Sequence, residues 1–427
     1  VNCNKEDLEK EYAALVAEYE EVKGKGLKLN MARGKPCEDQ LNLSRPLLDV
    51  INSSTDCITA HGADCRNYGE LAGIDECKNF FAEIFDVDPS DVMVGGNSSL
   101  NMMFDTIAGF MTKPVVEGCK PWYEVKNRKF LCPAPGYDRH FAITEYFDFD
   151  LIPVPMTENG PDMDVVEKLV ENDDSIKGIW CVPKYSNPLG ITFSDETVKR
   201  FAALKPAAKD FRIMWDNAYC IHEFDGEFRP FKDILTLCRE AGNPDMVFKF
   251  ASTSKVTFPG GGIACFACSE ANMEYMTKLI GIQAISFDKM NQLRHVRFLK
   301  NKEGVLAHMA KHRRRLVPCF DAVKTAFAAN LTPCGDIAHW TNPKGGYFIS
   351  LYVMPGCAKR VAGLCKDAGL TLTGAGSAYP YHKDPQDSHL RIAPTYPSLD
   401  EVEMASELLC VCVRLAVVEK LLADKAD

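Results

Sequence analysis

Between residues 46 and 270, short apolar runs alternate with segments of helical periodicity, and this alternation restricts the fold more than any other feature of the sequence. The runs that read as buried strands are DVMVGG, KFLCPAP, DLIPVPM, GIWCVPK, FRIMWDN, VFKFAS and GIACFAC. Helical patterns lie between several of them, as at 74–85, 101–111 and 195–204. Strands that alternate with helices predict an α/β fold with a mostly parallel sheet that helices cover on both faces. We expect its ligand site beyond the carboxyl ends of the strands.

The two ends of the chain predict a second, smaller α+β unit. Residues 5–22 carry apolar side chains at alternating four- and three-residue steps, which indicates an amphipathic helix with Asn4 as its cap. Residues 298–329 form a long helical pattern that we expect to break near Pro318. A strand, a helix, another strand and a final helix from Leu399 follow, the first three in GGYFISLYV, CAKRVAGLCKDAG and LRIAP. We therefore expect an N-terminal helix and arm at 1–45 that belongs to the small unit, a large domain at 46–315 and a small domain at 316–427.

Charge and cysteine usage argue against several classes of function. The net charge is −10 and the pI is near 5.5, so a surface that binds nucleic acid phosphates is not expected. The 18 cysteines are scattered without a CxxC pair, which disfavours a zinc site. No apolar run reaches the roughly 18 residues of a membrane span. A charged, helical N-terminal segment in place of a secretory signal, with many unpatterned cysteines, favours a cytoplasmic protein.

Polar and aromatic side chains follow the ends of three predicted strands. Ser98 and Ser99 come after DVMVGG at the start of a helix, where hydroxyls and free backbone amides suit a phosphate; a double N-cap is the alternative. Tyr137 and His140 follow KFLCPAP, and Tyr137 is either a ring face for a planar ligand or a packed loop aromatic. Asn187 follows GIWCVPK in an Asn-Pro turn, so its amide either donates to a ligand or serves the turn alone.

Two further strand ends carry an acid and a lysine. Asp216 ends FRIMW, where a buried carboxylate needs a cationic or hydrogen-bonded partner, and Tyr219 shares the same cleft. Lys255 follows VFKFA in the segment STSK, together with Ser252 and Ser254. A desolvated lysine has a lowered pKa, and its neutral amine is a good nucleophile for carbonyls. We therefore predict that Lys255 attacks a carbonyl group of a ligand.

The small unit adds a cation to this set. Arg391, in LRIAP, has a planar guanidinium that suits bidentate capture of a carboxylate. The strand ends together supply a phosphate cradle, a ring face, an aspartate, a phenol, an amide and a nucleophilic lysine. A cofactor with an aldehyde, a pyridine ring and a phosphate would use each of these groups.

The motifs DNAY, SNPLG and STSK resemble those of the class I aminotransferases, pyridoxal-phosphate enzymes of the aspartate aminotransferase fold. The resemblance runs from YGELAG at 68–73 to LRIAP at 390–394, and ARGKP and STSKVTFPGGG are most similar to a divergent bacterial subgroup. It implies the type I fold of pyridoxal-phosphate-dependent transferases, whose large domain has a mostly parallel seven-stranded sheet. It also implies pyridoxal 5'-phosphate as cofactor and a homodimer with shared sites.

The resemblance gives each catalytic candidate a role. Lys255 resembles the lysine that holds the cofactor as an internal aldimine and then moves the substrate's proton. Asp216 resembles the carboxylate that keeps the pyridine nitrogen protonated, and His140 resembles the histidine that supports it from behind. Tyr219 and Asn187 resemble the donors to the cofactor's phenolic oxygen.

Other residues match binding positions of the family. Tyr137 takes the position of the ring that stacks on the cofactor, and Tyr68 that of a tyrosine that reaches the phosphate of a neighbouring subunit. Gly34, Asn187 and Arg391 resemble binders of the substrate's α-carboxylate. The resemblance implies that the phosphate is held by Ser98, Ser99, Ser252 and Ser254, and Leu100 is a further cofactor-binding candidate.

One position departs from the family pattern. The family has an arginine in a PG-x-R-x-G run after the lysine, and this arginine pairs with the phosphate. Here the run is PGGGIA, and Gly262 stands at that position. Arg294, His295 or the backbone amides of residues 260–262 are candidates to replace the arginine.

The predicted function is a pyridoxal-phosphate-dependent aminotransferase that moves an amino group between an L-amino acid and a 2-oxo acid by a ping-pong mechanism. Aspartate and glutamate are the preferred substrates, and their distal carboxylate needs a second cation, for which Arg33, Lys35, Arg294 and Arg297 are candidates.

Other functions remain open at this point. The alternative is another reaction of the same cofactor, by a β-lyase, a decarboxylase or a cyclopropane-forming synthase, because the shared residues do not select the bond that breaks. A regulator with an aminotransferase-like sensor domain is disfavoured. Such a protein carries an N-terminal DNA-binding unit, whereas one helix and an arm precede the large domain here, and the chain is acidic.

Overall fold

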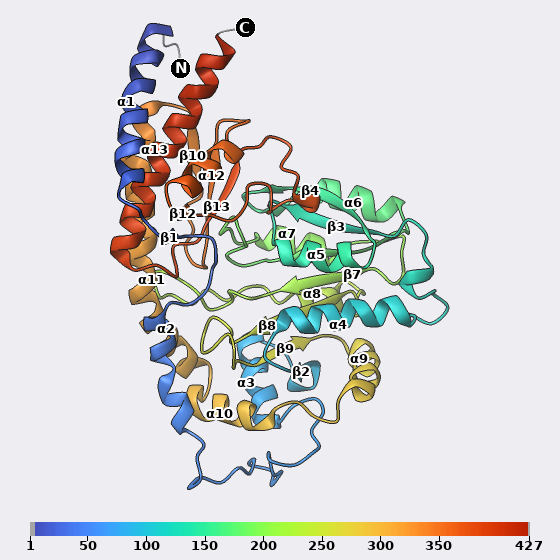
Figure 1. Cartoon of the computed structure of the whole chain (residues 1–427). Helices are drawn as coiled ribbons and strands as arrows, with labels where there is room; N and C mark the ends of the chain where they lie inside the picture. Colours follow the sequence, from blue (N-terminus) through green and yellow to red (C-terminus); the bar gives the residue numbers. More distant parts are fainter. Residues whose placement is uncertain (1–4, 426–427) are drawn as a thin grey trace.

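The computed structural model describes residues 5–425, and its centre is an eight-stranded sheet with the order β2-β9-β8-β7-β6-β3-β4-β5 (Figure 1). The strands from β8 through β7, β6 and β3 to β4 pair in parallel, whereas β9 is antiparallel to both of its neighbours. The sheet is therefore mostly parallel, as predicted. Its strands are β2 (Val92–Val94), β3 (Lys129–Ala134), β4 (Asp150–Thr157), β5 (Gly160–Pro161), β6 (Ile176–Cys181), β7 (Arg212–Asp216), β8 (Val247–Ser252) and β9 (Ala264–Ala267).

The predicted number of strands was one too low. The seven predicted runs all form strands, and the additional strand is β5, which pairs antiparallel with the end of β4 through Met156 and Thr157. A strand of two residues is too short to show a period of two in the sequence, so no pattern indicated it.

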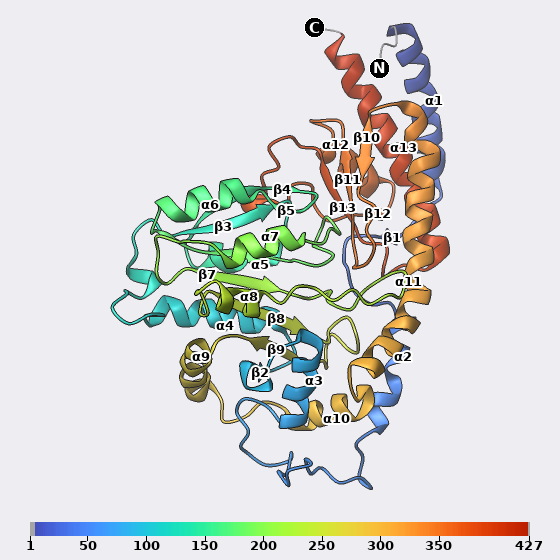
Figure 2. The same ribbon diagram turned by 180° about the vertical axis from the view of Figure 1, so that it is seen from behind.

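Helices cover both faces of the sheet, as the opposite views of Figures 1 and 2 show. Successive residues of a strand point to opposite faces, so Ile213 and Trp215 of β7 join one core cluster and Met214 joins the other. The first cluster includes side chains of α3 (Asp75–Phe85), α6 (Met163–Asn172), α7 (Asp195–Ala202), α8 (Ile234–Glu240) and α10 (Lys289–Leu299). The second includes side chains of α4 (Ser99–Thr112), α5 (Asp138–Tyr146) and α9 (Glu270–Gln283).

Both ends of the chain build a second core. Leu8 and Leu15 of the N-terminal helix share this core with Phe320 and Leu409 of two C-terminal helices, and Figure 1 shows the three helices side by side. These helices are α1 (Lys5–Gly24), α11 (Lys302–Asn330) and α13 (Leu399–Asp424). The other elements of the chain are α2 (Glu38–Leu43), α12 (Ala358–Asp367), an antiparallel sheet of β10 (Ala338–Trp340), β11 (Ile349–Val353) and β13 (His389–Ile392), and a parallel pair of β1 (Leu29–Asn30) and β12 (Leu370–Thr371).

The predicted break near Pro318 is wrong, because α11 continues through this proline. The interruption lies earlier, at Lys300, which has a φ of 68°, and at Asn301, whose side chain accepts a hydrogen bond from the backbone N of Gly304 at 3.0 Å and caps α11. Leu316 and Phe320 are buried on either side of Pro318, so packing holds the helix although one backbone donor is missing. The predicted Asn4 cap lies outside the described residues.

The proposed boundary between residues 315 and 316 falls inside α11, which therefore runs through both units. We keep the division into 1–45, 46–315 and 316–427 as a proposal. Within residues 5–425, no helix combines the length and the apolar character that a membrane span requires. The same residues contain no cluster of histidine, cysteine, aspartate or glutamate suited to hold a metal ion.

Candidate active site

Loops at the carboxyl edge of the large sheet meet at a cavity of about 170 Å³. The strands β3, β6, β7 and β8 are parallel neighbours in the sheet, so the loops that follow them leave from the same edge. Val182 and Ala218 take part in the lining. All other lining residues were predicted to bind the cofactor: Ser98, Ser99, Leu100, Tyr137, Asn187, Asp216, Tyr219, Ser252, Ser254 and Lys255.

Asp216 ends β7, and the two oxygens of its carboxylate have different surroundings. Its Oδ2 lies 2.9 Å from Nε2 of His140, a buried residue of α5 whose ring stacks on Trp180 at 4.5 Å. Its Oδ1 is buried and has no hydrogen-bond partner among residues 5–425. A buried carboxylate oxygen without a partner is costly, so this atom calls for a donor that a ligand would bring. A protonated ring nitrogen would meet that need.

Lys255 follows β8 and directs its amine into the same cavity. Its Nζ lies 5.3 Å from the centre of the Tyr219 ring and 5.9 Å from the centre of the Tyr347 ring. Burial lowers the pKa of Lys255, and the charge of Asp216 opposes this shift. A lower pKa leaves more of the amine neutral, and the neutral amine is the form that attacks a carbonyl or accepts a proton.

The start of α4 and the end of β8 form a polar wall of the cavity. Ser98 is the N-cap of α4, and its Oγ accepts a hydrogen bond from the backbone N of Asn101 at 3.4 Å. The first backbone N–H groups of a helix have no partner within the helix, and its dipole favours an anion there. The hydroxyl oxygens of Ser252 and Ser254 lie 3.0 Å apart on the same cavity. This wall suits a phosphate.

Arg391 reaches the site from β13 of the smaller unit. Its Nη1 lies 3.3 Å from Oδ1 of both Asp138 and Asn187, and its Nη2 donates to Oγ1 of Thr373 at 3.1 Å. Its Nε is buried and has no partner among the described residues. The guanidinium is therefore held in place and still has a donor for an anionic ligand.

Two tyrosines line the cavity with protonated phenols. Tyr137 precedes α5, and its ring packs edge-on against that of His140 at 4.8 Å. Burial raises the pKa of Tyr137 to about 12 and raises the pKa of Tyr219 well above its ordinary value. Both phenols keep their proton near neutral pH, and each can donate a hydrogen bond.

Two glycines of the predicted set lie where a side chain has no room. A Cβ at Gly34 would clash with the ring of Phe348, over which the guanidinium of Arg391 lies at 5.0 Å. A Cβ at Gly262 would lie 2.8 Å from Oγ1 of Thr253 and 2.9 Å from the carbonyl oxygen of Phe258. The loop after Lys255 is thus packed too closely at Gly262 to hold an arginine there.

The candidates to replace that arginine differ in their surroundings. His295 is buried in α10, 2.8 Å from Oγ1 of Thr257, and burial lowers its pKa to about 4, so it carries no charge at neutral pH. The Nε of Arg294 is buried without a partner among residues 5–425. Neither residue lines the cavity. Asn291 of the same helix binds the carbonyl oxygens of Gly261 and Gly262 at 3.0 and 2.9 Å and so holds this loop.

Several predicted residues lie away from the cavity. Tyr68 is 78 % exposed. Lys35 lies over the ring of Tyr396 at 3.8 Å, and Nη2 of Arg297 pairs with Oδ1 of Asp56 at 2.7 Å. The residues that do not line the cavity are Gly34, Tyr68, His140, Arg391 and all four candidates for a distal cation, Arg33, Lys35, Arg294 and Arg297.

Two hydrogen-bond partners of Arg391, Asp138 and Thr373, were not predicted from the sequence. Asp138 stands between Tyr137 and His140 in the segment GYDRH, so its place after a predicted strand was a usable indication. Thr373 comes from a loop after β12 of the smaller unit, to which Arg391 also belongs, and no local pattern brings it near Arg391.

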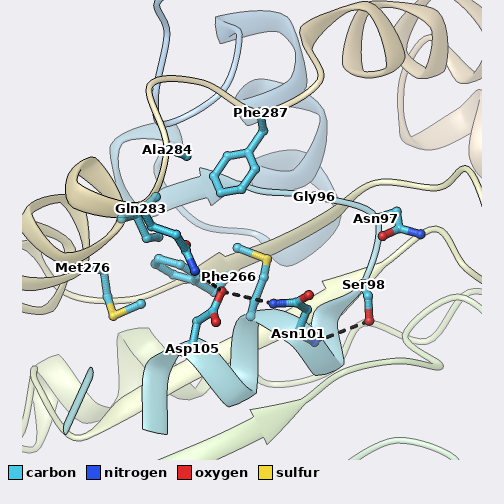
Figure 3. Close-up of a pocket in the computed structure, with 12 residues that line it drawn as sticks. Gly96, Asn97, Ser98, Asn101, Asp105, Phe266, Met276, Gln283, Ala284 and Phe287 are labelled. Atoms are coloured by element: carbon cyan, nitrogen blue, oxygen red, sulfur yellow. Dashed lines mark hydrogen bonds between the residues drawn. The ribbon is translucent and has the colours of Figure 1, made fainter. Parts of the chain in front are cut away.

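A second hollow, of about 230 Å³, opens beside Ser98 between α4 and α9 (Figure 3). Inside it, Oδ2 of Asp105 accepts hydrogen bonds from Asn101 at 3.1 Å and from Gln283 at 3.2 Å. Ile282, next to Gln283, is 90 % exposed. The hollow also has apolar lining from Met102, Phe266, Met276, Ile280 and Phe287.

Comparisons with known proteins identify the family of the chain. The family model of aspartate amino-transferase matches residues 3–425. A protein of Mycolicibacterium smegmatis that is named as an aminotransferase is 46% identical over 425 residues, which cover 99% of each chain. The crystal structure of an aspartate transaminase from Corynebacterium glutamicum has a TM-score of 0.96 and 43% identity, with 98% of each chain covered. An α-aminoadipate aminotransferase of Thermus thermophilus, complexed with N-(5'-phosphopyridoxyl)-L-leucine, shares the fold with a TM-score of 0.72 and 18% identity over 95% of each chain.

Proposed function

The chain belongs to the aspartate aminotransferase family and is an aminotransferase, and from this premise we propose that it transfers the amino group of aspartate or glutamate to a 2-oxo acid. We further propose that pyridoxal 5'-phosphate binds in the cavity of about 170 Å³. The name of the Corynebacterium glutamicum relative supports the choice of substrate. The observation that carries the proposal is the unpartnered, buried Oδ1 of Asp216 in the same cavity as the amine of Lys255.

The lining residues fit each part of this cofactor. Oδ1 of Asp216 would accept a hydrogen bond from the protonated ring nitrogen, and the wall at the start of α4 would hold the phosphate. Tyr137 would cover a face of the ring, and Lys255 would bind the aldehyde carbon. When bound, this cofactor supplies an electron sink that makes the α-hydrogen of an amino acid acidic.

Lys255 has two proposed tasks. Its amine would hold the cofactor through the aldehyde carbon, and the free amine would accept the α-proton of the amino acid as a general base and donate it as a general acid. The lowered pKa of Lys255 suits the second task, because only the neutral amine accepts a proton. Asp216, which His140 supports, would keep the ring nitrogen protonated, and Tyr219 and Asn187 would donate hydrogen bonds to the phenolic oxygen.

Arg391 is proposed to bind the α-carboxylate of the substrate, since its Nε lacks a partner and its two Nη atoms are already oriented by other side chains. A distal carboxylate needs a further cation. Arg297 is engaged by Asp56, so Arg33, Lys35 and Arg294 remain as candidates, from this chain or from a second copy of it.

We propose that the protein acts as a homodimer in which Tyr68 serves the neighbouring site. Tyr68 is 78 % exposed, and at the end of α9 Ile282 and Ile285 are 90 % and 64 % exposed beside the hollow at Ser98. A second copy that covered this face would remove these apolar side chains from water.

The cellular compartment of the protein is a proposal as well. Every cysteine between residues 5 and 425 is a free thiol. Free thiols persist in a reducing compartment, and we propose the cytoplasm.

The first test is the visible absorption spectrum of the purified protein before and after addition of L-aspartate or L-glutamate. We expect a yellow band of lysine-bound cofactor that either amino acid bleaches, with release of the matching 2-oxo acid. A band that neither amino acid bleaches would keep the cofactor and reject acidic substrates. A bleached band with release of ammonia would indicate a lyase. The absence of a band after addition of pyridoxal phosphate would overturn the cofactor proposal.

A further inference from the structure

A buried polar network lies close to Lys255 and contains none of the residues proposed to bind the cofactor. It joins α2 and α11 to the loop after β8 and to the strand region of the smaller unit. Its side chains are Gln40, Ser44, His308, His312 and Tyr347, each at most 5 % exposed. Polar groups buried to this degree are retained when each has a hydrogen-bond partner, and here the partners are the other members of the network.

Gln40 of α2 is one end of the network, and the orientation of its amide follows from its hydrogen bonds. The backbone N of Cys37 donates to Oε1 of Gln40 at 3.2 Å, so Nε2 of Gln40 is the donor end of the amide. This Nε2 lies 3.0 Å from Nδ1 of His312 and 3.1 Å from the hydroxyl oxygen of Tyr347. The amide of Gln40 thus joins α2 to His312 of α11 and to Tyr347 of the smaller unit.

The other end of the network reaches the backbone next to Lys255. Nε2 of His312 lies 3.1 Å from Nε2 of His308, which is 2.9 Å from the carbonyl oxygen of Val256 and 3.0 Å from Oγ of Ser44. The hydroxyl of Ser44 also donates to the carbonyl of Val256, at 3.3 Å. Two helices are thus tied to the peptide that immediately follows Lys255.

Tyr347 carries the network to the side chain of Lys255. The Tyr347 ring lies 5.9 Å from Nζ of Lys255 and 5.9 Å from the ring of Tyr219, which itself lies 5.3 Å from that Nζ. His222 packs edge-on against both rings, at 5.5 and 5.8 Å. The amine of Lys255 is therefore confined by rings whose positions depend on the network.

The histidines in this region carry no charge near neutral pH. Burial lowers the pKa of His308, and it lowers the pKa of His312 and of His222 to about 3. The phenols of Tyr219 and Tyr347 are neutral as well, because burial raises the pKa of each. Asp216 is the charged group that acts on Lys255. The network therefore holds the lysine without adding a positive charge beside it.

We propose that Gln40, His308 and His312 are positioning residues for Lys255, which act through the carbonyl of Val256 and the ring of Tyr347. The proposal rests on the proposed role of Lys255. Loss of the network would leave the cofactor contacts in place and would let the lysine loop shift and take up water. Displacement of a reacting group by about 1 Å costs up to about 100-fold in rate.

The test compares His308→Leu, which removes the polar ring, with His308→Gln, whose amide keeps a polar group near the position of Nε2. A milder variant is Tyr347→Phe, and its control is Tyr19→Phe. The control also removes one buried phenolic hydroxyl, which in the wild type donates to the carbonyl of Leu364 at 2.9 Å in the smaller unit. Each variant is first checked for a cooperative thermal transition, and Tyr347→Phe decides the case if His308→Leu does not fold.

The first readout uses the cofactor-free protein, so that it does not depend on turnover. The rate at which trace acetic anhydride labels Lys255 is followed against pH by mass spectrometry, and this rate gives the pKa of the amine. We expect His308→Leu and Tyr347→Phe to raise that pKa toward its ordinary value by about half a unit or more, because water regains access to the amine. His308→Gln and Tyr19→Phe should match the wild type.

The second readout is turnover of the cofactor-loaded enzyme. We expect kcat to fall about 10- to 100-fold in His308→Leu with a smaller change in KM, and His308→Gln to restore most of it. Wild-type labelling and wild-type kcat in a folded His308→Leu or Tyr347→Phe variant would overturn the proposal. If the wild type forms no band with pyridoxal phosphate, the proposed function fails, whereas the labelling comparison still decides whether the network positions Lys255.

Discussion

At the scale of single residues, the cavity brings together an acid, Asp216, and a base, Lys255, which have different surroundings. Asp216 has one oxygen held by His140 and the other without a partner, so it is prepared to accept a hydrogen bond from a ligand. Lys255 is desolvated, which favours its neutral amine. Such a pair in a cavity is typical of an active site and not of a structural ion pair, in which both groups would bind each other.

Replacement of Asp216 by asparagine tests the acid of this pair. The shape of the side chain is kept and its charge is lost, so we expect kcat/KM to fall by about 100- to 1,000-fold, the effect of removing one preorganised electrostatic contact. The labelling pKa of Lys255 in the cofactor-free variant should also fall further, because the charge of Asp216 raises it in the wild type.

The control for this prediction is Asp173→Asn, which removes a carboxylate that pairs with Lys129 at 2.6 Å at the opposite, amino end of β3. We expect it to leave kcat/KM unchanged. Equal activities of Asp216→Asn and Asp173→Asn would contradict the role of Asp216.

At the scale of elements, strand ends and helix starts deliver the functional groups. β7 and β8 are neighbours, so Asp216 and the residues that follow Ser252 leave the sheet side by side. The first turn of α4 adds backbone donors and the hydroxyl of Ser98. Regular elements therefore place most of the site, whereas Arg391 depends on the placement of the smaller unit.

Replacement of Ser98 by alanine tests the start of α4 as a phosphate site. Loss of the N-cap should lower the free energy of unfolding by about 1 kcal/mol. The affinity for pyridoxal phosphate should fall about 10-fold, and the affinity for pyridoxal, which lacks the phosphate, should stay the same.

Ser194→Ala is the matched control, since Ser194 caps α7 by accepting from the backbone N of Thr197 at 3.1 Å and does not line the cavity. It should lose similar stability and keep wild-type affinity for both compounds. An equal loss of affinity for pyridoxal and pyridoxal phosphate in Ser98→Ala would speak against a phosphate at this helix.

Replacement of Gly262 by alanine tests the packing of the loop after Lys255. A Cβ there would lie 2.8 Å from Oγ1 of Thr253, and we expect the variant to lose about 1–3 kcal/mol of unfolding free energy through overpacking. A Cβ at Gly260 would have no atom within 4 Å, so Gly260→Ala should be close to wild type. Chemical denaturation of both variants measures the difference, and equal stabilities would show that the loop shifts to make room for a Cβ at Gly262.

At the scale of the whole molecule, the site lies where the large unit and the smaller unit meet. Arg391 comes from β13, whereas its partners Asp138 and Asn187 belong to the large unit, and α11 runs through both. Buried histidines also occur in both units, among them His295 in α10 and His389 in β13. Their protonation links the stability of the whole chain to pH.

Stability should fall as the pH drops from about 6.5 to 4. Burial lowers the pKa of His222, His312 and His389 to about 3 and that of His295 to about 4. In this window the unfolded chain binds protons that the folded chain does not, so acid favours unfolding. Each of these histidines lowers the free energy of unfolding by up to about 1.4 kcal/mol for each pH unit.

Thermal unfolding at pH 7, 6, 5 and 4 measures this dependence. His389→Gln keeps an amide near Oγ of Ser350, which lies 2.8 Å from Nε2 of His389, and removes one titrating group. This variant should lose less stability than the wild type over the same pH range. An unfolding midpoint that does not change between pH 6.5 and 4 would contradict the prediction.

The sequence by itself determined the order of the strands along the chain and the chemistry at their ends. Buried strands carry uninterrupted apolar runs, and helices carry a period of 3.6, so DVMVGG and residues 74–85 indicate their structure locally. Parallel strands end at one edge, so residues as distant along the chain as Tyr137, Asp216 and Lys255 could be assigned to one cavity. This inference needs only the strand pattern.

The tertiary structure alone decided the contacts that no local pattern encodes. The bonds of Arg391 to Asp138, the tie of His308 to the carbonyl of Val256 and the close packing at Gly262 join segments whose approach depends on side-chain volume and on the path of the chain. The same packing carries α11 through Pro318, although proline predicts a break. A proline inside a helix costs about 1–3 kcal/mol of free energy, and the burial of Leu316 and Phe320 on either side of it outweighs this cost.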